Sequence, residues 1–489
     1  MIAGSRRGAV PLRLTLDGAG HQLIERGLAR IRREFEVPNE FPVEVLRDAQ
    51  RAVAERTGKT AELDDQRDVP LRTLDPAGSR DLDQAFAIAR RAVGYRLWYA
   101  VADVAGFVRP NGPLDHESRA RGVTLYLPDR RAGLHPELLS EGAASLLSGQ
   151  ETPALLWSFD LDRDGVVSAT RVRRALVRSR AQLSYPQVQD AVDRGMADEQ
   201  VALLVEVGRV LREREIARGG VSLDLPEQQV KFTATADDAG YRLAFRRPLE
   251  AEHHNAQLSL LTGIAAAQVM LDGGIGLLRT LPQAGEEALD TLRRAGRELG
   301  YAWPADQPYA DWIRTVAATE PKGVALVTQA LHTFRGAGYE AFDGTAPVAP
   351  QHAALAAPYA HVTAPLRRLA DRFANQVVLD LVAERPPAEW AVEALPELPA
   401  IMARAGQRAA AIDRAVVDLV ESVVLSPTVG TTYAAIAVNR RGDDTIVHLL
   451  EPAVVATLAG HGNIPLGSTL EVRLVEADPQ AGTVRFALA

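Results

Sequence analysis

Strand-forming and helix-forming segments are segregated along this 489-residue chain, and this separation most constrains its fold. From about residue 69, short apolar runs alternate with Gly, Pro or Asp, which is the pattern of β-strands. After residue 252, long amphipathic segments with the spacing of helices dominate. This order favours one large α/β or α+β domain, with a mixed sheet and flanking helices, that reaches about residue 425. The clearest strand-like runs are residues 86–88, 97–101, 123–127 and 155–159.

The first part of the chain has a helical pattern instead. Residues 19–35 and 43–56 carry apolar side chains at helical spacing, and Pro38 and Pro42 separate the two segments. Two short helices with a tight connection predict either a helix-turn-helix-like module or a helical hairpin packed on the next domain. The arginines of this module could attract the phosphates of a nucleic acid, but only non-specifically.

The end of the chain returns to short strands. Four or five strands in about sixty residues fit a small barrel such as an OB-fold. The strand-like runs are residues 433–438, 445–449, 469–475 and 484–488. The predicted domains are therefore a helical module at 1–65, an α/β (α+β) domain at 66–425 and an OB-fold barrel at 426–489.

The composition is that of a globular protein, with 47% hydrophobic and 24% charged residues. No apolar run approaches the roughly 18 residues that cross a bilayer, and no secretory signal precedes the first helix, so we expect a cytoplasmic monomer that does not bind membranes. The absence of cysteine excludes disulfides, thiolate zinc sites and cysteine nucleophiles, so any metal must bind to oxygen or imidazole. The net charge of −8 restricts nucleic-acid binding to a locally basic groove.

Three carboxylates crowd into one tight loop. Asp75, Asp81 and Asp83 lie within nine residues, and Pro76 and Gly78 constrain the loop that contains them. Like charges at this density need a positive partner, and Mg²⁺ prefers carboxylate oxygens while keeping positions open for a substrate phosphate. The alternative is a solvated turn in which the aspartates cap backbone N–H groups. The residues alone leave both interpretations open.

Other metal-like patterns are weaker. Asp160, Asp162 and Asp164 begin like an EF-hand loop, but Arg171 stands where the bidentate glutamate belongs. The Asp164-Gly165 pair instead predicts a β-hairpin. Zinc is not indicated by the histidines, because none has the spacing of an H-E-x-x-H site. These histidines are His116, His253, His254, His352 and His361.

The acidic loop resembles the signature of a known family. The spacing of Asp75, Asp81 and Asp83 after a Val-Pro-Leu-Arg-Thr-Leu strand is similar to that of the RNB family, the exoribonucleases of the ribonuclease II and ribonuclease R type together with the catalytic subunit of the exosome. Further blocks resemble the family in order and spacing, and together they cover roughly residues 66–425. They are Tyr-Ala-Val-Ala-Asp-Val at 99–104, Arg-Gly-Val-Thr-Leu-Tyr-Leu-Pro at 121–128 and Tyr-Ala-His-Val-Thr-Ala-Pro-Leu-Arg-Arg-Leu-Ala-Asp at 359–371.

The resemblance implies an Mg²⁺-dependent, processive 3′→5′ hydrolytic exoribonuclease that grips the 3′ end of single-stranded RNA and releases nucleoside 5′-monophosphates. One or two Mg²⁺ ions are implied at the loop acids. The metal positions fall on Asp75, Asp81, Asp83 and Gln84. The catalytic positions fall on Asp81, Asp83, Tyr185 and Arg367. The RNA-binding positions fall on Arg121, Tyr126, His361, Thr363 and Arg368.

Arg367 also has an argument of its own. Thr363 and Pro365 are typical of a helix start, with the threonine as N-cap and the proline in the first turn. A helix N-terminus attracts phosphate through its free N–H groups, and an arginine in that turn would add a bidentate grip. We therefore expect Arg367 to hold the scissile phosphate from the first turn of a helix.

The chain also departs from the family pattern. Gln84 stands where the family has a fourth acid, Leu223 offers the only bulky side chain where a clamping phenylalanine is usual, and Ala256-Gln257 replaces two glutamates. These changes keep a second hypothesis open, a catalytically weak or silent RNA-binding relative, and a DNA-directed phosphodiesterase is a third. Because only about 65 residues precede the catalytic blocks, we expect the helical module in place of the family's cold-shock barrels, which occupy about 140 residues.

Overall fold

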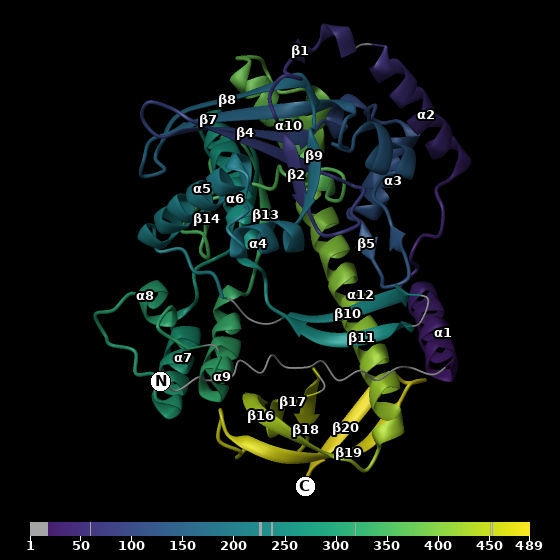
Figure 1. Cartoon of the computed structure of the whole chain (residues 1–489), viewed down its shortest axis with the longest axis vertical. Coiled ribbons are helices and arrows are strands. Elements are labelled where there is room, and N and C mark those ends of the chain that lie inside the picture. The colour runs from purple at the N-terminus through teal and green to yellow at the C-terminus, as the bar shows by residue number, and fades with distance from the viewer. Residues whose placement is uncertain are drawn as a thin grey trace.

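The computed structural model describes residues 18–58, 60–223, 227–235, 238–317, 319–449, 451 and 453–489. Figure 1 shows a large upper body, built around a β-sheet and its helices, and a small β-barrel at the opposite end of the molecule. The long helix α12 (Leu398–Leu425) runs from one to the other. Residues 1–17 of the predicted N-terminal module lie outside the described residues.

The largest sheet in the described part of the chain has seven strands, in the order β1-β8-β7-β4-β3-β2-β9. Its centre is an antiparallel run of β3, β4, β7 and β8, while β2 pairs in parallel with β9 and β1 with β8. Since β2 and β3 are neighbours, the acidic loop that joins them lies at one end of the sheet. The bounds are β1 (Asp64–Asp65), β2 (Arg72–Asp75), β3 (Gln84–Arg90), β4 (Tyr95–Ala102), β7 (Glu151–Leu161), β8 (Val167–Arg178) and β9 (Ala181–Ser184).

Alternation along the strands divides the two faces of this sheet. On β3, Phe86 and Ile88 join the main hydrophobic core, whereas Ala85 and Ala87 belong to a separate cluster of mostly small side chains. The main core also contains residues of α5 (Glu199–Ala217), α6 (Glu250–Asp272) and α10 (Leu369–Val382). The helices therefore cover the face that carries the large side chains, which is the mixed α/β architecture that the sequence predicts.

The predicted hairpin between β7 and β8 is confirmed. Gly165 has a φ of 74°, a conformation that favours glycine, and the Asp162 carboxylate accepts the N–H groups of Asp164 and Val166. The carboxylate of Asp162 thus stabilises the turn.

The N-terminal helices α1 (Gly18–Glu34) and α2 (Val43–Thr57) have the predicted extents within one residue. Ile24, Leu28 and Ile31 of α1 share a hydrophobic cluster with α12, whereas Val45 and Ala49 of α2 pack in a different cluster with α3 (Pro113–Arg121). Both helices pack on later parts of the chain, as the second predicted alternative expects, but they lie in separate clusters and do not pack together as the hairpin of that alternative.

The predicted C-terminal barrel is confirmed. Its described strands follow the order β18-β17-β16-β19-β20, and the outer strands β18 and β20 contact each other, which nearly closes the sheet as in an OB-fold. The one strand missing from the predicted runs is β18, in which only every second residue is buried. The bounds are β16 (Thr432–Arg441), β17 (Asp444–Leu449), β18 (Val455–Leu458), β19 (Thr469–Asp478) and β20 (Thr483–Leu488).

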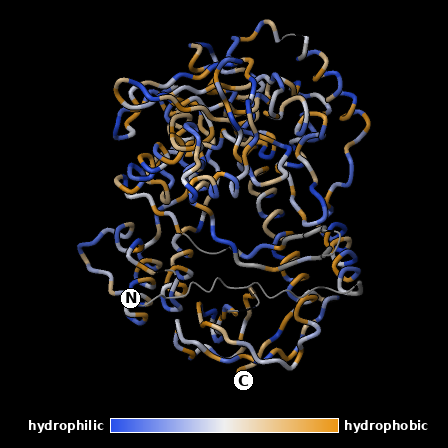
Figure 2. Tube along the Cα trace, viewed as in Figure 1, coloured by the Kyte–Doolittle hydropathy of each residue, from blue (hydrophilic) through white to orange (hydrophobic). Residues whose placement is uncertain are grey.

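Shorter elements connect these parts. Figure 2 shows hydrophobic positions recurring through both bodies, and no helix in the described ranges is long and apolar enough to span a membrane. The remaining strands are β5 (Leu125–Tyr126), β6 (Arg131–Ala132), β10 (Glu227–Thr235), β11 (Asp238–Arg246), β12 (Ile275–Thr280), β13 (Gly338–Asp343), β14 (Gln351–His352) and β15 (Ala357–Pro358). The remaining α-helices are α4 (Tyr185–Asp193), α7 (Glu286–Leu299), α8 (Tyr309–Ile313), α9 (Pro321–Ala330) and α11 (Glu389–Ala394).

Candidate functional site

Asp83 ends the acidic loop, directly before β3. Its side chain is only 5% exposed, and its Oδ1 accepts the backbone N–H of Leu366 at 2.8 Å. Its Oδ2 lies 3.3 Å from Nε of Arg367. Burial raises the pKa of Asp83 to about 7, although Arg367 and the Leu366 N–H act in the opposite direction. The structure therefore brings together the acid and the arginine that the sequence predicts as partners.

Asp75 ends β2 on the same side of the sheet. Its Oδ2 is buried and has no hydrogen-bond partner among the described residues. Burial raises the pKa of Asp75 to about 7; Arg367 opposes this shift, and the charge of Asp81 adds to it. An unpartnered carboxylate oxygen in such a place is costly unless a cation or a proton satisfies it.

Asp81 is held from the other side by two side chains that the sequence analysis missed as partners. Its Oδ1 accepts Nη1 of Arg131 at 2.9 Å, and its Oδ2 accepts the hydroxyl of Tyr126 at 2.9 Å. Arg131 also pairs with Glu141, so the acid is anchored to a small charged cluster. The only signal for this was the Arg130-Arg131 pair shortly after the Tyr126 block, and nothing in it indicated the partner.

The carboxylate oxygens of these three aspartates suit a hard cation, but they do not form a closed metal cage. Across the described residues, no group of three or more His, Asp or Glu side chains is arranged as a ready metal site. Mg²⁺ is often bound through one or two carboxylates and completes its shell with water and substrate phosphate. The orphaned oxygen of Asp75 and the buried carboxylate of Asp83 match that requirement.

Gln84, the residue in place of a fourth acid, uses both ends of its amide. Nε2 donates to the backbone carbonyl of Thr363 at 2.5 Å, and Oε1 accepts the hydroxyl of Tyr99 at 2.6 Å. The predicted role of Gln84 as a metal ligand remains a prediction. The observed contacts connect β3 and β4 to the segment before α10.

The predicted helix start at Thr363 is wrong. Helix α10 begins at Leu369, and the Thr363 hydroxyl bonds to Ser259 at 2.8 Å and caps no helix. The reason is a side-chain contact from the first turn of α10: Oδ1 of Asp371 accepts the N–H of Ala364 at 2.7 Å and holds the preceding segment as a loop. Arg367 therefore projects from a turn before the helix, with 49% of its side chain exposed.

The Arg-Gly-Val-Thr block supports this turn from the side. The N–H of Thr124 donates to the carbonyl of Arg367, and the N–H of Leu369 donates to the carbonyl of Gly122, both at 3.0 Å. Gly122 has a φ of 71°, and a Cβ there would lie 2.6 Å from Cβ of Ala405. Only glycine fits this position without a shift of α12. This block of the sequence therefore positions Arg367.

Arg121 was predicted to contact RNA, and the structure gives it an internal role instead. Its side chain is buried, and it donates to the side chain of Glu117 and to the backbone carbonyls of Gly133 and Glu40. Its guanidinium also stacks 3.7 Å from the ring centre of Phe41. These contacts tie the segment after α1 to α3, and they occupy the donors that a phosphate would need.

Arg368 and His361 also have internal partners, and their predicted RNA contacts remain predictions. Arg368 makes a bidentate pair with Asp371, at 3.0 Å and 2.7 Å. Nδ1 of His361 is hydrogen bonded to the Tyr339 hydroxyl at 2.6 Å. Burial, together with the charge of Arg368, holds the pKa of His361 well below its ordinary value. Both side chains therefore stabilise the segment that leads to Arg367.

The two predicted tyrosines lie beside the acids. The side chain of Tyr126 is 47% exposed although its hydroxyl is bound to Asp81, so its ring is accessible to a base. Tyr185 begins α4, and its hydroxyl accepts Nδ2 of Asn255 at 3.1 Å. Burial raises the pKa of Tyr185, and the nearby Asp75 adds to that shift. Their roles in stacking and in catalysis remain predictions.

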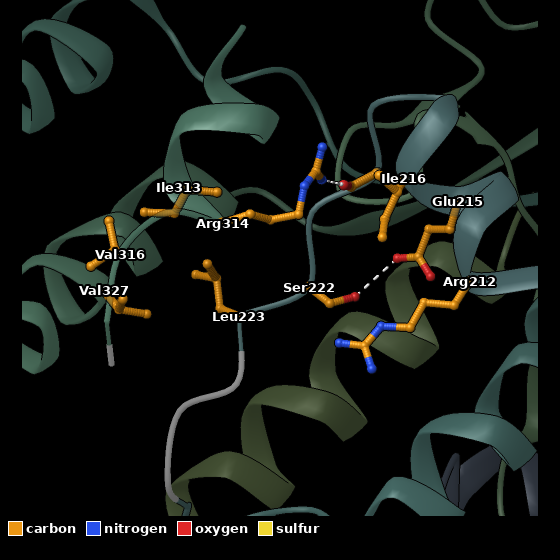
Figure 3. Close-up of a pocket in the computed structure, with 10 residues that line it drawn as sticks. Arg212, Glu215, Ile216, Ser222, Leu223, Ile313, Arg314, Val316 and Val327 are labelled. Carbon is orange, nitrogen blue, oxygen red and sulfur yellow. Dashed lines mark hydrogen bonds between the residues drawn. The ribbon is translucent and has the colours of Figure 1, made fainter. Parts of the chain in front are cut away.

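The substitutions for the family's clamp and glutamates lie in a different environment. Figure 3 shows the Leu223 side chain directed toward Ile313 and Val316, where it lines a pocket of about 290 Å³. Gln257 donates to the buried carboxylate of Glu215, which also accepts the hydroxyl of Ser222. Leu223 thus packs in the helical cluster around α8 and α9.

Comparison with known proteins identifies the family. The RNB domain model matches residues 63–384, and that of the RNase II-type exonuclease C-terminal S1 domain matches residues 431–489. Ribonuclease R of Escherichia coli is 30% identical over 337 residues, which cover 65% of this chain and 40% of that protein. Exosome complex exonuclease RRP44 homolog A of Arabidopsis thaliana is 28% identical over 64% of this chain and 35% of its own length. The chain thus spans less than half the length of these curated relatives.

Solved structures show the same fold. The apo form of Mycoplasma genitalium RNase R matches with a TM-score of 0.83 at 19% identity, over 95% of this chain and 78% of that one. Yeast Ssd1, described as a pseudonuclease, matches with a TM-score of 0.68 at 16% identity, over 92% of this chain and 57% of that one. The RNB model alone covers more than half of the residues, from β1 into the end of α10. The chain therefore belongs to the RNB family.

Proposed function

We propose that the chain is an Mg²⁺-dependent exoribonuclease that hydrolyses single-stranded RNA processively from its 3′ end and releases nucleoside 5′-monophosphates. The observation that carries this proposal is the half-exposed Arg367 guanidinium beside the buried carboxylate of Asp83, next to the orphaned oxygen of Asp75. A positive group and unsatisfied acids at one end of a sheet suit a bound phosphodiester and its cation.

Each residue has a distinct task in this proposal. Arg367 donates N–H groups to a non-bridging oxygen of the terminal phosphodiester, and Asp83 holds its Nε so that the guanidinium stays oriented. Asp75, Asp81 and Asp83 are the groups that would hold the cation. When bound, Mg²⁺ supplies charge neutralisation at the phosphate and a lowered pKa for the attacking water. Whether one or two ions are held is part of the test below.

The RNA strand would be gripped mainly through stacking. Tyr126 offers an accessible ring beside Asp81, and base–aromatic stacking contributes about 1–3 kcal/mol per base without sequence preference. The family membership supports this proposal, as do two structures with the same fold, Mycoplasma genitalium RNase R in complex with ribose-methylated single-stranded RNA and with double-stranded RNA.

One feature favours a second candidate function, an RNA-binding relative without activity. The amide of Gln84 brings no charge to the acidic loop, and the fold is shared with a protein described as a pseudonuclease. Such a protein would keep Tyr126 and Arg367 as RNA contacts but would not shorten the strand.

One assay distinguishes these functions. The protein is incubated with 5′-labelled single-stranded RNA or DNA of equal sequence, with Mg²⁺ or with EDTA, and the products are resolved on a sequencing gel. The proposal predicts RNA shortened to a short limit fragment, without accumulation of intermediate lengths, and no shortening in EDTA. RNA binding without shortening would favour the silent relative, and equal cleavage of DNA would contradict the RNA selectivity. Repeating the assay across Mg²⁺ concentrations tests ion number, because a Hill coefficient near 2 indicates two ions.

A further inference from the structure

Gln84 is the feature of the site that the proposed function leaves unexplained. It directly follows Asp83, and its amide reaches across to the segment that carries Arg367 through the Thr363 carbonyl at 2.5 Å. Asp83 itself binds the same segment at the N–H of Leu366. Two adjacent residues therefore hold one short loop at two points.

The chemistry of these contacts requires an amide. The Thr363 carbonyl can only accept a hydrogen bond, so it needs the NH₂ group that a glutamine has and a carboxylate lacks. The amide oxygen then accepts a hydrogen bond from the hydroxyl of Tyr99, a buried residue of β4. A carboxylate at position 84 would place negative charge against the carbonyl oxygen, and an aspartate would also be one methylene too short.

Other contacts show that the position of this loop is specified closely. The Thr363 hydroxyl is bonded to Ser259, and the carbonyl of Val362 accepts Nδ2 of Asn375 at 2.8 Å. From the far side, the N–H of Ala364 is bonded to Asp371. Because all of these anchors precede Arg367 by a few residues, a change at the Thr363 carbonyl would move the guanidinium relative to Asp83.

We propose that Gln84 is a positioning residue that fixes the Arg367 loop against Asp83, and that it does not serve as a ligand to the cation. This inference rests on the proposed function of the site. The charge for the cation then comes from Asp75, Asp81 and Asp83 alone, and the loss of the family's fourth acid is exchanged for a tether that an acid cannot form.

The test uses four variants of the full chain. Gln84→Met keeps the length of the side chain and removes both hydrogen bonds, whereas Gln84→Glu restores an acid and removes the donor. The matched control is Gln200→Met, since Gln200 also makes a donor and an acceptor bond to β3, at the backbone of Ile88. Thermal unfolding of each variant shows whether the fold is kept. Tyr99→Phe removes only one hydroxyl and remains testable if Gln84→Met does not fold.

We expect Gln84→Met to lower kcat for RNA shortening about 10- to 100-fold at every Mg²⁺ concentration, because a small displacement of a catalytic group is enough for such a loss. The Mg²⁺ concentration at half-maximal rate should not change, and Gln200→Met should keep the wild-type kcat. Gln84→Glu should be at least as impaired as Gln84→Met. Tyr99→Phe should show a smaller loss that is not additive with Gln84→Met. Recovery of Gln84→Met by excess Mg²⁺, or a faster Gln84→Glu enzyme, would overturn the proposal and identify position 84 as a ligand.

A second readout does not depend on catalysis. Binding of a 5′-fluorescent single-stranded RNA in EDTA should weaken about 3- to 10-fold in Gln84→Met, because a displaced charged hydrogen bond is weakened and not wholly lost, and should not change in Gln200→Met. Unchanged affinity in Gln84→Met would contradict the positioning role. If the wild-type chain binds RNA but does not shorten it, the proposed function fails while this binding comparison still decides the role of Gln84.

Discussion

The carboxylate of Asp83 lies 3.3 Å from Nε of Arg367 and accepts the backbone N–H of Leu366, the residue before Arg367. The acid comes from the loop between the first strands of the sheet, and the arginine comes from the turn before α10. This contact is where two distant segments of the chain create one site. Substitutions of these two residues therefore test the proposed function most sharply.

Replacing Arg367 by lysine should separate charge from geometry. A lysine keeps the positive charge but loses the planar fork that can pair with Asp83 and with a phosphate at the same time. We expect kcat for RNA shortening to fall about 100-fold, a loss comparable to removal of a transition-state hydrogen bond, with a smaller change in KM. Single-turnover kinetics measure this, with Arg194→Lys just after α4, an exposed partner of Asp190, as the matched control. A wild-type rate in Arg367→Lys would show that the fork is not needed.

Substitutions of Tyr126 test how the RNA strand is bound. Tyr126→Ala should weaken binding of single-stranded RNA in EDTA by about 1–3 kcal/mol, the contribution of one stacked base. Tyr126→Phe keeps the ring and removes only the hydroxyl bonded to Asp81, so its RNA affinity should match the wild type. Fluorescence anisotropy gives both values. Equal affinities for the alanine variant and the wild type would remove Tyr126 from the RNA path.

Because Glu421 of α12 is buried, we expect the stability of the protein to depend on pH through this residue, which lies outside the acidic site. Burial raises the pKa of Glu421 to about 7, while Gln228 and the N–H of Val455 donate to its carboxyl group. The ordinary pKa of a glutamate side chain is 4.5, so the folded state favours the protonated form. Its stabilising contribution is complete below pH 4.5 and is lost as the pH rises through 7.

Glu421→Gln should therefore stabilise the protein at pH 8, by on the order of 2 kcal/mol, and should have little effect at pH 4.5. The midpoint of thermal unfolding, compared with the wild type at both pH values, measures this difference. Glu34→Gln, at an exposed carboxylate of α1, should show no such pH response. A Glu421→Gln effect of equal size at both pH values would mean that the carboxyl group does not titrate in this range.

Much of the fold follows from local patterns. Alternation between large and small side chains on β3, the Asp-Gly turn between β7 and β8, and the strand spacing of the barrel are all visible in short stretches of sequence. The extents of α1 and α2 follow from helical spacing and prolines. Local patterns do not tell which surfaces these helices pack on, because the partners lie in α3 and α12.

The errors within the site have a common physical cause, which is pairing of polar side chains that charge and spacing alone do not show. Thr363 and Pro365 carry good local signals for a helix start, but the Asp371 side chain captures Ala364 and delays the helix to Leu369. Arg121 and Arg368 resemble phosphate contacts in sequence, yet their donors are used inside the protein. Charge and spacing cannot show whether an arginine already has a partner. Resemblance to a family supplied the acids and Arg367, and it could not supply the contacts of Gln84.

The most direct measurement of the central claim is the single-turnover rate of RNA shortening in Asp83→Asn at saturating Mg²⁺. Asparagine keeps an oxygen for the N–H of Leu366 but has no charge for Arg367 or for a cation. The account predicts a rate at least about 100-fold below that of the wild type, with RNA binding in EDTA retained. An Asp83→Asn protein that shortens RNA at the wild-type rate would contradict it.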